Sequence, residues 1–188
     1  MILGTHTRIR FSEGEDASFY RNLYLTNEPK AALLDARREY GMPVRHEIEE
    51  LLRKSESSRA YLFTVEDLEG QRRGWCGLRG LNVEAGYCEL FLVFRSDEEF
   101  LTPMADEALA MLLYRAFQQL RLNKVLVFSL KRESGLQQCL MKQGFRSCGI
   151  QRDVLYSGGT WHNLNTFVLP QQAYDPETAQ GKSGEIEP

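Results

Sequence analysis

One carboxylate lies in an otherwise apolar part of the chain. Glu89 falls within Tyr87–Phe94, a nearly continuous apolar run that is typical of a strand buried on both faces. Apolar surroundings raise the pKa of a carboxyl group and suit it to accept a proton near neutral pH. Glu89 is therefore a candidate general base. A strand residue that faces solvent is the equally simple alternative.

Three consecutive acids, Asp97–Glu99, precede a helix that is predicted to begin at Pro103. Proline suits the first helical position because its missing N–H would be unpaired there in any case. The free N–H groups and the dipole at a helix N-terminus attract anions. We expect the acids to satisfy this helix end themselves and to repel a phosphate there, or else to form an ordinary solvated helix start.

The thiols and imidazoles offer less chemistry. Cys76, Cys88, Cys139 and Cys148 form no CxxC pair, and each lies in an apolar stretch where a free cysteine behaves as a small hydrophobe. The three histidines lie near no cysteine pair, so no metal site is expected. This use of cysteine favours a reducing, cytoplasmic location.

Length and charge set the broader limits. The 188 residues suit a single domain, and 23 basic against 26 acidic residues leave a net charge of -3. No basic excess is present for binding nucleic acid, and no apolar run is long enough for a transmembrane helix. We expect a soluble domain over residues 1–170. Residues 171–188, poor in large apolar side chains, are expected to form a disordered tail.

Hydrophobic periodicity predicts the elements that position these groups. Helical spacing predicts helices over 16–25, 31–40, 44–54, 103–120 and 134–143. Alternating or continuous apolar runs predict strands over 7–11, 60–66, 74–81, 87–94, 124–130, 145–150, 153–156 and 163–169. The strand, helix and strand between 87 and 130 imply a parallel pair joined by a right-handed crossover.

Several local motifs follow one another in a characteristic order between residues 6 and 169. They are Arg8–Phe11 followed by Asp16, Tyr87–Phe91, Glu107–Ala108, Tyr114–Phe117, Leu122–Val125, Gln143–Phe145 and Gly159–Asn163. In order and spacing they resemble the GCN5-related N-acetyltransferases (GNAT superfamily), and most closely the ribosomal-protein-alanine N-acetyltransferase subgroup. The resemblance implies an α/β (α+β) GNAT fold. In that fold a mixed sheet of about seven strands, flanked by about four helices, splays between its fourth and fifth strands.

The resemblance also implies an activity. Such an enzyme moves an acetyl or other acyl group from a CoA-type thioester to a primary amine, which belongs to a small molecule or to a protein N-terminus. The donor, acetyl-CoA or another acyl-CoA, is expected in the gap between the splayed strands. The expected partner is the amine acceptor rather than nucleic acid or membrane, and the protein is expected to be a monomer or a homodimer.

The family's donor contacts can be carried over by position. The backbone of Leu92, Val93 and Phe94 would bind the pantetheine arm. Thr102, Met104 and Ala105, at the start of the crossover helix, would meet the diphosphate. The family loop reads Arg/Gln-x-x-Gly-x-Gly/Ala, and residues 100–105 match it only at Ala105, with Pro103 in place of a glycine.

Two catalytic positions of the family also differ here. Leu140 stands where the family's tyrosine acid is expected, and Glu133 stands where an asparagine is expected. Tyr156 is therefore the predicted proton donor, with Ser129 as the alternative, and Ser129 is also a predicted contact of the acyl donor. The altered loop leaves a second function open. A catalytically degenerate GNAT-fold protein would bind a metabolite or a partner protein without acetyl transfer.

Overall fold

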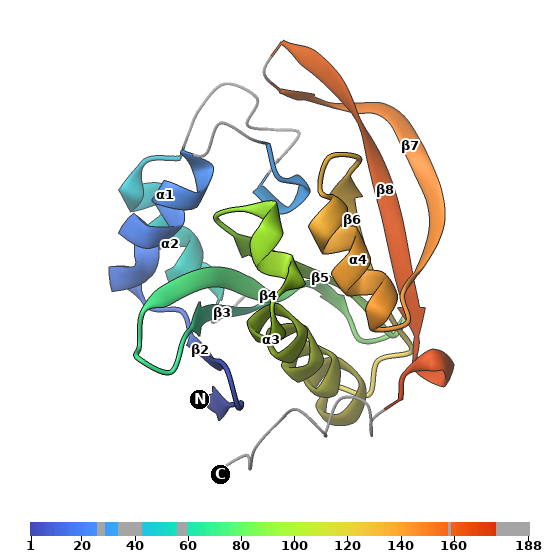
Figure 1. Ribbon diagram of the computed structural model, residues 1–188, viewed down its shortest axis with the longest axis horizontal. Coiled ribbons are helices and arrows are strands. Elements are labelled where there is room, and N and C mark those ends of the chain that lie inside the picture. Colours follow the sequence, from blue (N-terminus) through green and yellow to red (C-terminus); the bar gives the residue numbers. More distant parts are fainter. Residues whose placement is uncertain (26–28, 34–42, 56–59, 158, 176–188) are drawn as a thin grey trace.

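The computed structural model describes residues 1–25, 29–33, 43–55, 60–157 and 159–175. Within them, eight strands form one sheet in the order β1-β2-β3-β4-β5-β6-β8-β7 (Figure 1). Their bounds are β1 Ile2–Leu3, β2 Arg8–Phe11, β3 Tyr61–Glu66, β4 Arg72–Asn82, β5 Tyr87–Phe94, β6 Lys124–Leu130, β7 Arg146–Ser157 and β8 Thr160–Pro170. Neighbouring strands are antiparallel except β5 and β6, which are parallel as the crossover predicted.

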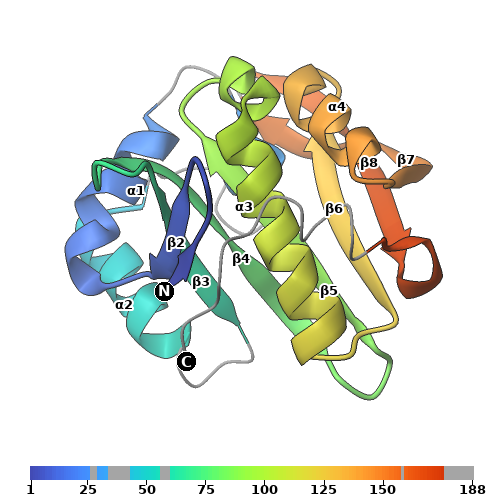
Figure 2. The ribbon, with the colours of Figure 1, turned by 60° about the horizontal axis from the view of Figure 1, so that its bottom comes forward.

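The described residues contain four α-helices, which cover the two faces of the sheet. They are α1 Ala17–Tyr24, α2 Arg45–Ser55, α3 Pro103–Tyr114 and α4 Ser134–Lys142. Short 3₁₀ turns are η1 Gly14–Asp16, η2 Ala31–Leu33, η3 Asp97–Leu101 and η5 Gln171–Ala173, and a π-helical segment, η4 Arg115–Gln119, extends α3. Helix α3 runs across the sheet beside α4, while α1 and α2 lie together on the far side of β3 and β4 (Figure 2). No helix in the described part of the chain is long and apolar enough to span a membrane.

Strand β5 shows why its sequence is apolar at nearly every position. Alternate side chains of a strand point to opposite faces. Leu90, Leu92 and Phe94 pack into the cluster beneath α3 and α4, whereas Phe91 and Val93 pack beneath α1 and α2. Each face of β5 is therefore covered by its own helical layer, as the apolar run predicted.

The fold differs from the sequence prediction in three places. Strand β1, Ile2–Leu3, makes the eighth strand and is too short to show a pattern. The predicted strands 145–150 and 153–156 form the single strand β7, whose register shifts between Gln151 and Leu155. Of the predicted helix 31–40, the structure shows the turn η2, and residues 34–40 lie outside the described residues.

The chain continues as described structure past the predicted domain boundary. After η5, the ring of Tyr174 lies 4.8 Å from that of Phe117 and packs against the main core. The predicted tail from 176 onward lies outside the described residues.

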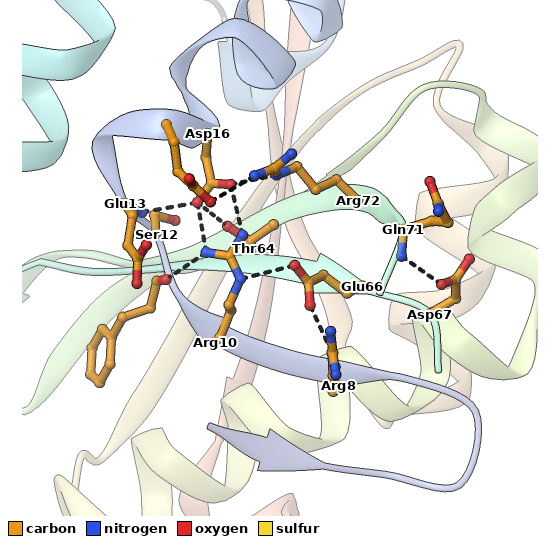
Figure 3. A network of polar contacts seen from close by, with 12 residues as sticks. Arg8, Arg10, Ser12, Glu13, Asp16, Thr64, Glu66, Asp67, Gln71 and Arg72 are labelled. Atoms are coloured by element: carbon orange, nitrogen blue, oxygen red, sulfur yellow. Dashed lines mark hydrogen bonds and ion pairs between the residues drawn. The ribbon is translucent and has the colours of Figure 1, made fainter. Parts of the chain in front are cut away.

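A buried ion-pair network joins β2 to the start of α1 (Figure 3). Arg10 donates two hydrogen bonds of 2.8 Å to the carboxylate of Asp16 and a third, 2.9 Å long, to Glu66. Arg72 and Thr64 also donate to Asp16, whose side chain is fully buried. Burial acts to raise the pKa of Asp16, but these hydrogen bonds outweigh it and lower the pKa to about 2. The network thereby fixes β2, β3, β4 and the start of α1 together.

We expect Asp16→Asn to destabilise the fold by about 3 kcal/mol or more near neutral pH, because it removes the buried anion that Arg10 and Arg72 share and leaves Arg10 with Glu66 alone. A lowered pKa in the folded state means that the stabilisation is present above about pH 4 and is lost as pH falls toward 2. Urea unfolding at several pH values measures both effects. The exposed Glu84→Gln serves as the control, and an equal pH dependence in Asp16→Asn and wild type would contradict the assignment.

Candidate active site

The parallel strands β5 and β6 separate part-way along their length. Their register pairs are Tyr87 with Lys124, Cys88 with Val125 and Glu89 with Leu126, and the pairing ends there. Beyond the Glu89–Leu126 pair, the backbone N–H and C=O groups on the facing edges of β5 and β6 do not hydrogen-bond to each other. Unpaired strand edges bind extended ligands through main-chain hydrogen bonds. The predicted splay between these two strands is therefore confirmed.

The predicted pantetheine-binding residues line the β5 edge of this gap. Leu92, Val93 and Phe94 all lie beyond the last paired residue, and each residue, backbone included, is at most 2% exposed. Their side chains belong to the two cores, so a ligand in the gap could meet only those of their backbone groups that are not paired with β4. This placement fits an extended arm that binds by main-chain contacts rather than by side-chain recognition.

On the opposite edge, Ser129 carries an unsatisfied hydroxyl group. Ser129 lies on β6 beyond Leu126, its side chain is fully buried, and its Oγ has no hydrogen-bond partner among the described residues. A buried polar group without a partner costs about 1–3 kcal/mol, so such groups point to a missing partner. The polar groups of a pantetheine arm in the gap would fit that role.

Glu89 lies at the closed end of the gap, where β5 and β6 are last paired. Its carboxylate is 2.5 Å from the guanidinium of Arg79, its cross-strand neighbour on β4. The prediction that Glu89 has apolar surroundings is therefore wrong where it faces β4, because the guanidinium of Arg79 contacts its carboxylate directly. The side chain is 22% exposed, which leaves one part of the carboxylate accessible.

Sequence reasoning missed Arg79. The hairpin contained the signal. Leu81 and Tyr87 flank the predicted Asn82–Gly86 turn, and two steps away from the turn along each strand place Arg79 opposite Glu89. The guanidinium also donates to the carbonyl oxygen of Ala32 at 3.1 Å and lies over the ring of Phe91. Arg79 therefore joins the candidate base to turn η2.

Glu133 is a buried carboxyl group just beyond the end of β6. Its oxygens accept hydrogen bonds from the amide of Leu130 at 2.6 Å and from that of Ala31 at 3.2 Å. Burial raises the pKa of Glu133 to about 7, although the two amide hydrogen bonds act to lower it. The sequence had marked this position only as the replacement of an asparagine. The structure shows a group that can titrate near neutral pH at the mouth of the gap.

The three acids before α3 have other partners than the sequence suggested. Asp97 does not occupy the N-terminus of α3; its carboxylate accepts hydrogen bonds from the amides of Gly135 at 2.6 Å and Leu136 at 3.3 Å, at the start of α4. Glu99 accepts from the amide of Ser96 in a capping box of η3. The reason is that residues 97–101 form a 3₁₀ turn, which redirects these side chains away from α3. Glu98 is exposed.

Turn η3 is held tightly against α4. A Cβ at Gly135 would lie 2.2 Å from the carbonyl oxygen of Asp97, so a side chain there would force the two elements apart. The open end of the gap is thus bordered by a turn in which Asp97 and Glu99 are engaged with backbone amides.

The predicted diphosphate contacts surround the start of α3. The hydroxyl of Thr102 donates to the carbonyl oxygen of Glu99 at 2.7 Å. The backbone amide of Ala105 donates to the carbonyl oxygen of Thr102 at 3.1 Å. Pro103 has no N–H, and the side chain of Met104 packs against the core. The structure brings these residues to the open end of the gap but gives them few donors for an anion.

Tyr156 lies outside this arrangement. It is opposite Trp161 near the end of the β7–β8 hairpin, with the two rings 5.3 Å apart, and β8 separates its strand from β6. Its neighbour Leu155 faces η2, so Tyr156 faces the opposite side of the strand. His162 pairs with the carbonyl oxygen of Ser157 on the same hairpin.

Trp75 and the cysteines serve mainly in packing. Trp75 is stacked on Tyr20 in the core beneath α1 and α2. Cys76, Cys88 and Cys139 are buried free thiols, as expected, whereas Cys148 is exposed on β7. Within the described residues, no group of three or more potential ligands could hold a metal ion.

Comparison with known proteins agrees with this geometry. The family described as "Acetyltransferase (GNAT) domain" matches residues 11–146, a span that contains both edges of the gap. The chain belongs to the GNAT acetyltransferase family. The general prediction is therefore confirmed, while the ribosomal-protein-alanine subgroup stays a prediction. No curated protein matches the chain in a sequence search.

Solved structures share the fold of this GNAT domain. Spermidine N-acetyltransferase from Vibrio cholerae in complex with CoA and spermine matches with a TM-score of 0.73 and 20% identity, over 89% of this chain and 97% of that one. Its complex with manganese ions matches with a TM-score of 0.71 and 19% identity, over 89% and 94%. A probable acetyltransferase matches with a TM-score of 0.72 and 20% identity, over 90% and 96%. At these identities the likeness shows the fold alone.

We expect Glu133→Gln to change how stability depends on pH. A raised pKa in the folded state means that wild type loses stability as pH rises from about 4.5 to 7, by roughly 3 kcal/mol at most, because the unfolded chain releases this proton first. The side-chain amide of the variant has no proton to release. In urea unfolding at about pH 5 and pH 8, the free energy of unfolding of the variant relative to that of wild type should therefore be higher at pH 8 than at pH 5. Equal slopes, with exposed Glu84→Gln as the control, would contradict the assignment.

Proposed function

We propose that this GNAT domain transfers an acetyl or other acyl group from a CoA-type thioester to a primary amine. The observation that carries the proposal is the β5–β6 gap, with the unsatisfied hydroxyl of Ser129 on one strand and a β5 edge that β6 does not pair with on the other. The gap gives an extended thioester arm main-chain partners, and Glu89 lies at its closed end.

The roles of the residues follow from their places. The backbone of Leu92, Val93 and Phe94 would bind the pantetheine arm, and Ser129 would satisfy one of its polar groups. The amine nitrogen attacks the thioester carbon, so that a C–N bond forms and the C–S bond breaks. Glu89 would first take a proton from the ammonium group, because only the neutral amine has the lone pair that the attack requires. The departing thiolate needs a proton. Tyr156 is the predicted donor of that proton, and its distance from the gap makes it the first role to test.

The nucleotide end of the donor has weaker support than its pantetheine end. Thr102, Met104 and Ala105 are the proposed diphosphate contacts, but Pro103 supplies no N–H and acidic side chains lie just upstream. We infer that most donor affinity comes from the pantetheine arm. A GNAT-fold protein that binds a metabolite or partner without acetyl transfer is the second candidate, and this altered loop is the observation that favours it.

Two classes of acceptor are compatible with the site. The subgroup resemblance favours the N-terminal amine of a protein that begins with alanine. The relatives solved as spermidine N-acetyltransferases suggest a polyamine. Both acceptors present a primary amine, so parallel assays with spermidine and an alanine-ended peptide separate them. A cytoplasmic location and a monomeric or homodimeric state, with no nucleic-acid partner, complete the proposal.

We expect Glu89→Gln to lower kcat by about 100-fold or more, because the variant cannot accept a proton. Donor binding should remain, since Gln keeps the size of the side chain at the closed end of the gap. Turnover is measured by thiol release, and donor binding by thermal shift, where acetyl-CoA at 100 times its Kd stabilises by about 2.7 kcal/mol. Glu84→Gln is the control. Unchanged turnover would remove Glu89 from the mechanism, and no shift in wild type would favour the non-catalytic alternative.

We expect acetyl-CoA and S-acetylpantetheine to serve as donors with kcat/KM values within about tenfold of each other. The missing N–H of Pro103 and the nearby acids leave the diphosphate few favourable contacts, each of which is commonly worth about 1 kcal/mol or more. Both donors are compared with the same amine under the same salt conditions. A preference of more than about 100-fold for acetyl-CoA would show that the nucleotide is recognised after all.

A further inference from the structure

Turn η2 is hydrogen-bonded to both halves of the sheet, the β4–β5 half and the β6 half, on either side of the gap. It contacts both β5 and β6 on the face opposite to α3 and α4. From one half, Arg79 donates to the carbonyl oxygen of Ala32, and Lys30 donates to that of Arg95 at 3.1 Å. From the other half, Glu133 accepts from the amide of Ala31. Residues 30–33 therefore cover the point at which β5 and β6 separate.

One guanidinium connects this cover to the candidate base. Through Nη1, Arg79 contacts Ala32, and through Nη2 it contacts Glu89 at 2.5 Å. The ring of Phe91, with its centroid 5.1 Å from Cζ, lies against the guanidinium and restricts its orientation. A planar guanidinium can hold two acceptors in fixed directions at once, which the single ammonium of a lysine does not do.

We infer that Arg79 is a positioning residue. It fixes the Glu89 carboxylate relative to turn η2, on the face of the sheet opposite to α3 and α4, where the amine would bind. The inference rests on the proposed function, because it assigns Arg79 a role through Glu89. A base acts on an amine only when both are held in a defined geometry, and small displacements reduce the rate strongly. Among the described residues, the hydrogen bonds of Arg79 go to Glu89 and Ala32, so we expect its effect mainly on the acceptor side.

A double-mutant cycle tests this coupling. Arg79→Met, Glu89→Gln and the double variant are compared with wild type by kcat/KM for the amine. We expect Arg79→Met to lose about 10- to 100-fold and the double variant to be no worse than Glu89→Gln alone, because Arg79 acts through Glu89. Losses that multiply in the double variant would overturn the inference. Arg45→Met removes an exposed Arg–Glu pair on α2 and is the matched control.

Three further readouts separate positioning from a general structural effect. In Arg79→Met the loss should appear in kcat and in KM for the amine, while the Kd for CoA, measured by calorimetry, stays within about threefold. Arg79→Lys keeps the charge but not the fork, so we expect it to show the same pattern with a smaller loss. A fall in CoA affinity that parallels the fall in kcat/KM, or full activity in Arg79→Lys, would overturn the inference.

The outcome for Glu89→Gln keeps the two proposals distinguishable. If Glu89→Gln retains turnover, the proposed role of Glu89 fails and the positioning role of Arg79 fails with it. If Glu89→Gln is impaired but Arg79→Met is not, the proposed function stands and only the role of Arg79 is rejected.

Discussion

Beyond Glu89 and Leu126, β5 and β6 no longer hydrogen-bond to each other, and the surrounding elements are arranged around that separation. Backbone groups that leave a ladder must find other partners or face solvent or a ligand. Helices α3 and α4 cover one side of the separated strands, η3 borders its open end, and η2 crosses the other side (Figure 1). The same separation that interrupts the sheet creates its binding edge.

Carboxylates that accept hydrogen bonds from distant parts of the chain hold these elements in place. Asp16 joins β2, β4 and α1, Asp97 joins η3 to α4, and Glu133 joins η2 to the end of β6. Glu107 on α3 accepts hydrogen bonds from His6 and the amide of Thr7, which fixes the chain before β2. Removing any of these acids would leave buried donors unsatisfied, so each contributes to one defined arrangement of the elements around the gap.

The two sides of the gap differ in chemistry in a way that suits a two-substrate reaction. The side beneath α3 and α4 offers backbone groups and one unsatisfied hydroxyl, which suit a flexible neutral arm. The opposite side holds the Arg79–Glu89 pair and Glu133, whose pKa burial raises to about 7, and it is the side on which we propose that the amine is deprotonated. Glu89 is placed at the closed end of the gap, where β5 is last paired with β6.

By itself, the sequence determined most of the secondary structure and the fold. Apolar periodicity placed α3 and β6 and identified β5 as covered on both faces, because local spacing reflects which side chains a helix or strand can bury. The spacing of Arg10 and Asp16 also reappears as a bidentate ion pair. Strand β1 and the continuous β7 escaped prediction, since a two-residue strand has no period and a bulge interrupts the alternation of a longer one.

The partners of the polar groups were decided only by the tertiary structure. The sequence predicted that Asp97–Glu99 act at the start of α3, because they precede that helix. In the structure the carboxylate of Asp97 instead accepts the amide of Gly135 at the start of α4, 38 residues further along the chain. Glu89 read as a carboxylate in apolar surroundings, yet a cross-strand arginine contacts it. Periodicity records how much of a side chain is buried. It does not record which distant donor meets that side chain, because that contact depends on the packing of elements far apart in sequence.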